Sequence, residues 1–253
     1  MGEIRIIREP LLMEDLVSGL CMYPDLRDTD AENKKLIDLY RIWARIPDQT
    51  HSCNVAVVDL YERYFEDTDA LVTFERNVAV GVKTADCVPI LVYAPDRQGV
   101  GAIHAGWKGT LGGIVDNVMD VLESQDVDPS RLQVAFGPSI SKDVYEVDKE
   151  LADRFIEAGF RDYVSFPNGY DEKPHIDLQG VNKERFLRRG VKPGNIRLHP
   201  GCSFGSRGTD GIPLYASHRR SKGAPARMLT CIMLLDEREM SYYHSLCRVA
   251  CEN

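Results

Sequence analysis

Short apolar runs separated by polar turns dominate the middle of the chain. Runs of four to eight mostly apolar residues, rich in Val and Ile, are typical of buried strands. They predict strands over 53–59, 70–74, 78–82, 88–93, 99–104, 132–136 and 228–235. Apolar residues at helical spacing predict helices over 31–45, 114–122, 151–158 and 182–189. Gly159 and Gly190 follow two of these helices and are expected to end them.

Strands outnumber helices, and the helices fall between groups of strands. This order predicts an α+β layered domain with helices covering sheet faces. The chain has 253 residues and carries no repeat, low-complexity tract or linker-like segment. We therefore expect one domain spanning residues 1–253.

Composition narrows the class of protein. The chain has 31 basic and 39 acidic residues, a net charge of −8, which argues against a nonspecific nucleic-acid or anionic-membrane binder. The longest apolar run, 87–94, is far shorter than the roughly 20 residues of a membrane span. The N-terminus has no apolar signal core, and the seven cysteines form no CxxC pair. We therefore expect a reduced, cytoplasmic protein.

Three segments place a His or a Cys at a strand–loop junction. His51 lies just before a predicted strand, Cys87 lies between two strands, and His104 ends a strand before a Gly-rich turn. If the fold brings them together, two imidazoles and one thiolate form a three-ligand zinc site that leaves a fourth position open. Alternatively, Cys87 with one histidine is sufficient for a thiolate nucleophile. The spacing alone leaves both readings open, as well as ordinary structural roles.

Two specific motifs surround these residues, and four further segments follow the same order along the chain. The specific motifs are Thr84-Ala85-Asp86-Cys87-Val88-Pro89 and His104-Ala105-Gly106-Trp107-Lys108-Gly109. The supporting segments are Asp69-Ala70-Leu71-Val72-Thr73, Gly137-Pro138-Ser139-Ile140 with Tyr145-Glu146-Val147, Ile176-Asp177-Leu178 and Ser217-His218-Arg219-Arg220. Over roughly residues 49 to 235, this set of motifs resembles the YfiH-like family, also called laccase-domain or polyphenol-oxidase proteins.

This resemblance implies a single layered α/β/β/α domain with mixed sheets, similar to the catalytic domain of cytotoxic necrotizing factor toxins. It implies zinc held by His51, Cys87 and His104, with copper as the alternative metal. It also implies purine nucleoside chemistry: phosphorolysis of adenosine, inosine and methylthioadenosine, and deamination of adenosine. The partners would be a small nucleoside and phosphate, with no nucleic acid and no membrane.

Further residues have expected roles around such a centre. Cys87, His104 and Asp86 are the candidate catalytic residues, with Asp86 either orienting a ligand histidine or accepting a proton. Backbone N–H groups in the turn containing Gly109 could hold phosphate where the helix begins. Lys108 and Arg219 could add positive charge. The sequence does not choose between phosphorolysis and deamination, or between a monomer and a dimer.

Three alternative functions remain open. A thiol hydrolase or amidase would use Cys87 as nucleophile and His104 as base. A multicopper oxidase would need many histidines, whereas the chain has only six. A structural zinc staple would need a fourth protein ligand, for which His199 and Cys202 are the candidates.

Overall fold

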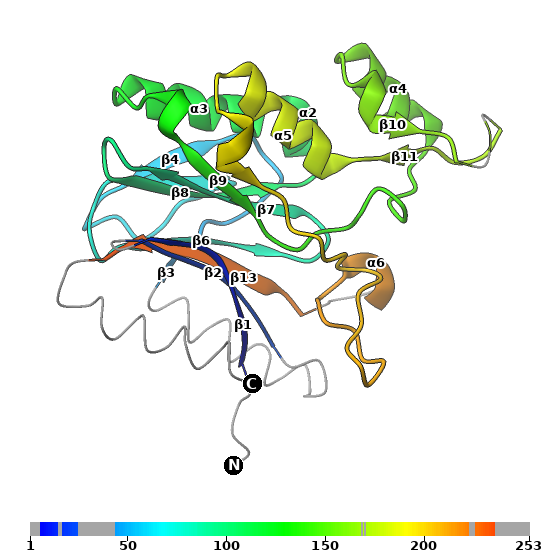
Figure 1. Cartoon of the computed structure of the whole chain (residues 1–253), viewed down its shortest axis with the longest axis horizontal. Helices are drawn as coiled ribbons and strands as arrows, with labels where there is room; N and C mark the ends of the chain where they lie inside the picture. Colours follow the sequence, from blue (N-terminus) through cyan, green and yellow to red (C-terminus); the bar gives the residue numbers. More distant parts are fainter. Residues whose placement is uncertain are drawn as a thin grey trace.

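The computed structural model describes residues 6–14, 17–24, 44–167, 169, 171–222 and 226–235. Two β-sheets face each other, and helices cover the outer face of one of them (Figure 1). Across the described residues, no helix combines the length and the apolar character needed to cross a membrane.

The larger sheet has six strands in the order β12-β9-β7-β8-β5-β4. Its strands are β4 (Val55–Val58), β5 (Ala70–Thr73), β7 (Val88–Ala94), β8 (Gly99–Ala105), β9 (Gln133–Phe136) and β12 (Ile196–Arg197). The sheet is mixed: β4 pairs parallel with β5, whereas β8 runs antiparallel to both β5 and β7. Consequently, the beginnings of β4, β5 and β7 lie at the same end of the sheet as the end of β8.

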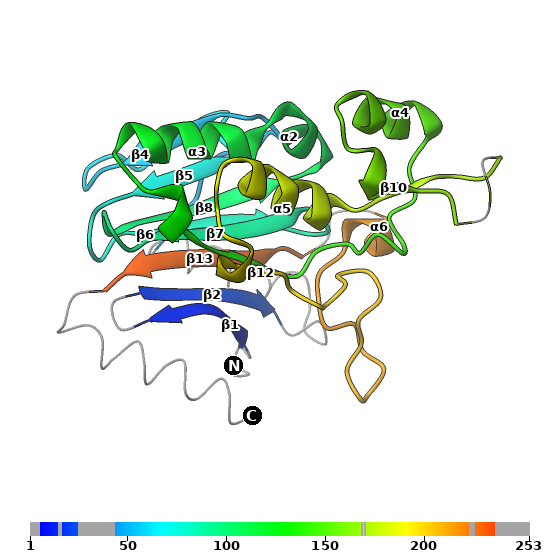
Figure 2. The same ribbon diagram turned by 45° about the horizontal axis from the view of Figure 1, so that its top comes forward.

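The smaller sheet has five strands in the order β1-β2-β13-β6-β3 (Figure 2). Its strands are β1 (Ile6–Glu14), β2 (Val17–Pro24), β3 (Ala44–Arg45), β6 (Ala79–Thr84) and β13 (Met228–Leu234). β13, near the end of the described chain, lies between β2 and β6 and pairs antiparallel with both. The sheet therefore joins segments that are distant in the sequence.

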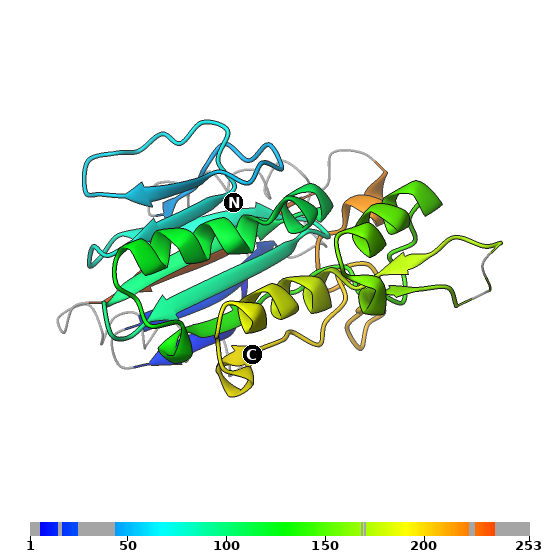
Figure 3. The same ribbon diagram turned by 90° about the horizontal axis from the view of Figure 1, so that it is seen from above.

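Helices α3 (Ile114–Ser124) and α5 (Leu178–Arg188) lie side by side on the outer face of the larger sheet (Figure 3). The short helix α2 (Trp107–Gly112) leads directly from β8 into α3. At one end of the sheet lie α4 (Lys149–Glu157), the ribbon of β10 (Val164–Ser165) and β11 (His175–Ile176), and α6 (His218–Ser221) (Figure 1). Single 3₁₀ turns occur at Pro129–Arg131, Arg161–Tyr163 and Pro193–Asn195.

Alternating side chains of the larger sheet build two cores. Leu71 and Leu91 face the smaller sheet and pack with Val82 and Ile232. Val72 belongs to the second core, beneath the helices. Because neighbouring residues of a strand point to opposite faces, a strand buried on both sides is apolar throughout. This explains why β7 appears in the sequence as a continuous apolar run.

The structure confirms the five strands predicted between residues 53 and 104 and those over 132–136 and 228–235, with ends shifted by a few residues. The helix predicted over 151–158 is α4, and Gly159 follows it with a φ of 84°. The helix predicted over 182–189 begins earlier, at Leu178, because the Asp177 side chain accepts a hydrogen bond from the Gly180 N–H and caps it.

Two other expectations have different outcomes. Most of the helix predicted over 31–45 lies outside the described residues, but its last two residues form β3, which pairs parallel with β6. Strands β1 and β2, helix α2 and the β10–β11 ribbon were not predicted. The α/β/β part of the expected layering is present, and the single domain over 1–253 stays a prediction.

Candidate metal centre

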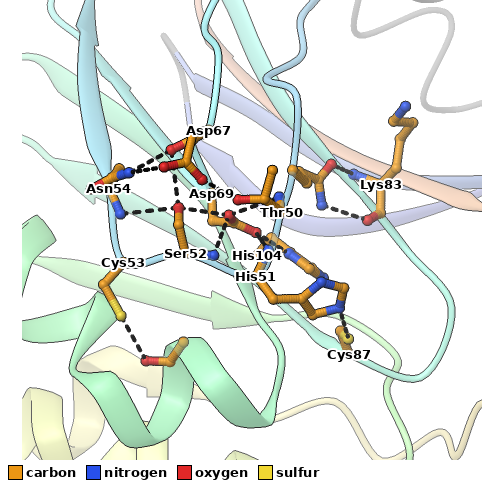
Figure 4. Close-up of polar contacts among 12 residues, drawn as sticks. Thr50, His51, Ser52, Cys53, Asn54, Asp67, Asp69, Lys83, Cys87 and His104 are labelled. Atoms are coloured by element: carbon orange, nitrogen blue, oxygen red, sulfur yellow. Dashed lines mark hydrogen bonds and ion pairs between the residues drawn. The ribbon is translucent and has the colours of Figure 1, made fainter.

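His51, Cys87 and His104 come together at one end of the larger sheet (Figure 4). One ligand atom from each lies within 4.8 Å of the other two. His51 precedes β4, Cys87 precedes β7, and His104 is the second-last residue of β8. The mixed strand directions place these three positions at one end of the sheet, which accounts for a cluster that no local spacing reveals.

The donor set and its separations fit zinc. Cys87 Sγ lies 3.8 Å from His51 Nε2, and the rings of His51 and His104 meet edge-on with centroids 4.8 Å apart. Bond lengths of about 2.3 Å to sulfur and about 2.0 Å to nitrogen place two ligands of one zinc ion about 3 to 4 Å apart. The three side chains could therefore hold one zinc ion with small adjustments.

A glycine keeps the cluster compact. A Cβ atom at Gly106 would lie 2.7 Å from His51 Cδ2 and 3.1 Å from Cys87 Sγ. Both distances are too short for ordinary side-chain contacts, so only glycine fits here without displacing a ligand. This gives a physical reason for the glycine that follows His104-Ala105 in the sequence.

Asp69 is the residue that sequence reasoning missed. Its carboxylate is fully buried and lies 2.5 Å from Nδ1 of His104. It also accepts hydrogen bonds from the backbone N–H groups of Thr50, His51 and Ser52 and from Ser52 Oγ. The available signal was an acidic residue directly before an apolar strand, Asp69-Ala70-Leu71-Val72-Thr73. Its pairing partner across the sheet was not visible in the sequence.

The structure corrects one expectation for Asp86. Asp86 does not orient a ligand histidine, because its carboxylate accepts hydrogen bonds from Ser203 Oγ at 2.6 Å and from the backbone N–H of Arg219 at 2.7 Å. The histidine-orienting contact belongs to Asp69. Asp86 is buried and has a φ of 84°, so it holds the turn before Cys87 in an uncommon backbone conformation.

The predicted phosphate ligands differ in their surroundings. Lys108 is exposed, and its Nζ lies 5.7 Å from the centre of the Trp107 ring. Gly109 is buried in α2, where a Cβ atom would lie 3.2 Å from the carbonyl oxygen of Ser52. The Arg219 guanidinium donates to the carbonyl oxygens of Val144 and Glu146. Two of the guanidinium nitrogens of Arg219 are therefore already engaged in holding the 144–146 segment.

The ionisable groups of the cluster favour their charged forms. Burial by itself would raise the pKa of Cys87, but hydrogen bonds and positive charge from His104 and His51 lower it to about 6. Burial would lower the pKa of His104, but Asp69 and the Cys87 thiolate raise it to about 9. Burial also opposes ionisation of Asp69, yet His104 and Ser52 keep its pKa below the usual value.

Tyr145 borders the same site. Burial, followed by the negative charges of Cys87 and Asp86, raises the pKa of its hydroxyl to about 12. The Arg219 guanidinium lies 5.1 Å from the centre of its ring. Tyr145 is therefore a neutral phenol at physiological pH, held beside the cluster by a stacked arginine.

The proposed fourth ligands of a structural zinc staple lie elsewhere. His199 Nδ1 accepts a hydrogen bond from the Gly201 N–H, and Cys202 Sγ accepts one from the Ser141 N–H at 3.4 Å. Within the part of the chain that the structure describes, the only His, Cys, Asp and Glu group suited to a metal contains His51, Cys87 and His104. Three ligands with an open position are typical of catalytic rather than structural zinc.

The fold and the site together define a layered α/β protein with a His–Cys–His candidate metal centre. Comparison with known families gives a match to the model described as "Multi-copper polyphenol oxidoreductase laccase" over residues 26–235. The chain belongs to this family.

Curated relatives carry the names of purine nucleoside enzymes. The chain is 38% identical over 170 residues to adenosine deaminase RL5 from an unknown prokaryotic organism, covering 62% of this chain and 64% of that protein. It is 34% identical over 180 residues to the purine nucleoside phosphorylase of Deinococcus radiodurans, covering 71% and 66% respectively. It is 29% identical over 234 residues to purine nucleoside phosphorylase YlmD of Bacillus subtilis, covering 87% and 82%. The chain thus spans slightly less than two thirds of the length of the first two relatives.

Solved structures share the fold. Hypothetical protein YfiH of Bacillus licheniformis superposes with a TM-score of 0.73 at 25% identity, covering 86% of this chain and 92% of that one. YlmD of Geobacillus stearothermophilus superposes with a TM-score of 0.69 at 24% identity, covering 87% and 92%. These likenesses support the layered α/β arrangement.

Proposed function

We propose that this chain is a zinc-dependent purine nucleoside enzyme, which phosphorolyses adenosine, inosine and methylthioadenosine and deaminates adenosine. The observation that carries the proposal is the His51–Cys87–His104 cluster, with its three ligand atoms within 4.8 Å of one another. The names of the relatives support the substrate class. Copper, which the family description mentions, is the alternative metal.

In this proposal, each residue of the cluster has a task. His51, Cys87 and His104 hold the metal, and Asp69 fixes the ring of His104 through Nδ1. When bound, zinc supplies Lewis acidity at the open position. Asp86, which is buried beside Cys87, is the candidate proton acceptor.

Phosphorolysis also needs a site for an anion. Gly106 adjoins the cluster and directly precedes α2, so the first backbone N–H groups of α2 begin beside the metal ligands. We assign phosphate to this turn, with Gly109 packing closely against the Ser52 carbonyl oxygen to hold α2 in place and Lys108 adding an exposed positive charge. Arg219 of α6, which also donates to the carbonyl oxygens of Val144 and Glu146, contributes a further positive charge.

A thiol hydrolase is the second candidate, and one observation favours it. The pKa of Cys87 is about 6 and that of His104 about 9, so the metal-free cluster holds a thiolate beside an imidazolium at neutral pH. Such a pair is typical of cysteine nucleophiles. Chelation separates the two candidates, because a thiol enzyme keeps its activity without metal.

The test is release of free base from adenosine and methylthioadenosine by the zinc-loaded protein, with and without phosphate. Cys87→Ala is the test variant, and Cys231→Ala in β13 is the matched control. Phosphate-dependent release of base, lost in Cys87→Ala and kept in Cys231→Ala, is the expected result. Inosine formed from adenosine without phosphate would make deamination the main reaction. Absence of turnover from all of these nucleosides by the zinc-loaded wild type would overturn the proposal.

A further inference from the structure

One buried carboxylate contacts both histidine-bearing segments of the metal centre. We propose that Asp69 is the positioning residue of this centre, which fixes the ring tautomer of His104 and the backbone conformation of His51 at the same time. This inference rests on the metal-binding part of the proposed function. It does not depend on which nucleoside, if any, the protein uses.

The contact to His104 sets which ring nitrogen faces the metal. Asp69 Oδ1 lies 2.5 Å from His104 Nδ1, and both side chains are buried. An ionised carboxylate only accepts hydrogen bonds, so Nδ1 must carry a proton. The lone pair of a neutral His104 is then on Nε2, the nitrogen left for the cluster. The strand register supports the contact, because the backbone N–H of His104 donates to the carbonyl oxygen of Asp69 at 2.8 Å.

The contacts to the 50–52 segment hold His51 in place. His51 has a φ of 65°, in the left-handed region that non-glycine residues rarely adopt. The backbone N–H groups of Thr50, His51 and Ser52 all converge on the Asp69 carboxylate at 2.7 to 3.1 Å. Three successive N–H groups pointing at one anion form a nest, which offsets the cost of the left-handed residue. This arrangement directs the His51 ring toward Cys87, with Nε2 at 3.8 Å from the sulfur (Figure 4).

An amide cannot replace this carboxylate. Oδ2 accepts hydrogen bonds from Thr50 N, Ser52 N and Ser52 Oγ, and Oδ1 accepts from His51 N and His104 Nδ1. Asparagine has only one acceptor oxygen. This oxygen best takes the position of Oδ2, because three groups donate to that position. The amide NH₂ would then face His104 Nδ1 and donate to it, moving the ring proton to Nε2. A protonated Nε2 has no lone pair for a metal.

Asp67 offers a matched control in the same loop. It is exposed and accepts hydrogen bonds from Thr50 Oγ1 and Asn54 Nδ2, and within the described part of the chain its carboxylate forms no hydrogen bond with a histidine. Its φ of 44° is tolerated by asparagine. Asp67→Asn therefore makes the same chemical change near the same loop without altering a contact to a metal ligand.

The experiment compares zinc affinity by chelator competition for wild type, Asp69→Asn and Asp67→Asn, with circular dichroism to check folding. Loss of a carboxylate behind a histidine ligand weakens metal binding about 10- to 100-fold. We expect that loss in Asp69→Asn and a change of less than about twofold in Asp67→Asn. Equal affinities for wild type and a folded Asp69→Asn would overturn the proposal.

A second measurement is independent of whether the variant folds. In the zinc-loaded wild type, ¹⁵N spectra of the His104 ring should show a protonated Nδ1 and an unprotonated Nε2. The reverse pattern would overturn the proposal. Wild type that binds no zinc would overturn the metal centre itself. Zinc binding without nucleoside turnover would overturn only the proposed reaction, because the affinity of Asp69→Asn and the His104 spectrum alone decide the role of Asp69.

Discussion

Two buried acidic residues, Asp69 and Asp86, adjoin the residues of the candidate metal centre and have different partners. Asp69, at the start of β5, contacts His104 and the backbone of the 50–52 segment. Asp86, directly before Cys87, contacts Ser203 and the backbone of Arg219. The first carboxylate therefore organises the ligands themselves, whereas the second ties the Cys87 turn to Ser203 and to the backbone of α6. Adjacency in sequence to a candidate ligand therefore does not predict which carboxylate contacts the histidines of the cluster.

The largest expected effect is the loss of the Asp69 carboxylate. In Asp69→Ala, three backbone N–H groups, one hydroxyl and the His104 ring lose their buried acceptor. Removing one partner of such a buried charged network costs about 3 to 5 kcal/mol of unfolding free energy. Urea denaturation of the metal-free protein measures it. A loss below about 1 kcal/mol would show that the network contributes little to folding.

Asp86→Ala tests the other side of the comparison. It leaves Ser203 Oγ and the Arg219 N–H without their acceptor and places alanine at a left-handed φ. We expect a loss of about 2 to 3 kcal/mol in urea denaturation. Because the Asp86 carboxylate forms no hydrogen bond or ion pair with a histidine in the part of the chain described, the His104 tautomer in the zinc-loaded protein should not change. A changed tautomer would mean that the two carboxylates are coupled.

The cysteine next to Asp86 and the cysteine near Asp69, Cys87 and Cys53, also differ in expected reactivity. The pKa of Cys87 is lowered to about 6, whereas burial and the charge of Asp69 raise that of Cys53 above its ordinary value. The thiolate is the reactive form and is present above the pKa, so alkylation of Cys87 should fall only as the pH drops through about 6. At pH 7, metal-free Cys87 should react about tenfold faster than Cys53, because a much larger fraction of Cys87 is thiolate and this outweighs the weaker nucleophilicity of a low-pKa thiolate. Mass spectrometry after iodoacetamide treatment measures both rates, and equal pH profiles would contradict the assignment.

The smallest expected effect is that of Ser203→Ala. Among the described residues, this change removes one of the two hydrogen bonds that the Asp86 carboxylate accepts and leaves the one from the Arg219 N–H in place. A typical hydrogen bond contributes about 0.5 to 1.5 kcal/mol to stability, and the Asp86 carboxylate keeps its other partner, so we expect a loss of about 1 kcal/mol. Thermal or urea denaturation measures it. If Ser203→Ala lost as much unfolding free energy as Asp86→Ala, the hydrogen bond from Ser203 would account for the entire stabilising effect of Asp86.

The sequence by itself determined the central strands and the three metal-ligand candidates. Strand β7 and helix α3 are visible because side-chain periodicity is a local property: a continuous apolar run fits a strand buried on both faces, and spacing of three and four fits a helix. His51, Cys87 and His104 were identified by their positions at strand ends and by the family resemblance. Their grouping in the structure agrees with that expectation.

The tertiary structure decided which carboxylate supports which ligand. Asp69 faces His104 because β5 and β8 pair with Ala70 opposite Ile103, and pairing between segments more than 30 residues apart leaves no local pattern in a single sequence. The placement of β13 between β2 and β6 was not predictable for the same reason, because these strands are distant in the sequence. The role of Arg219 was likewise set by contacts with a distant segment, the carbonyl oxygens of Val144 and Glu146. Periodicity fixes which face of a strand is buried, but only strand register and direction decide which polar side chains meet at its end.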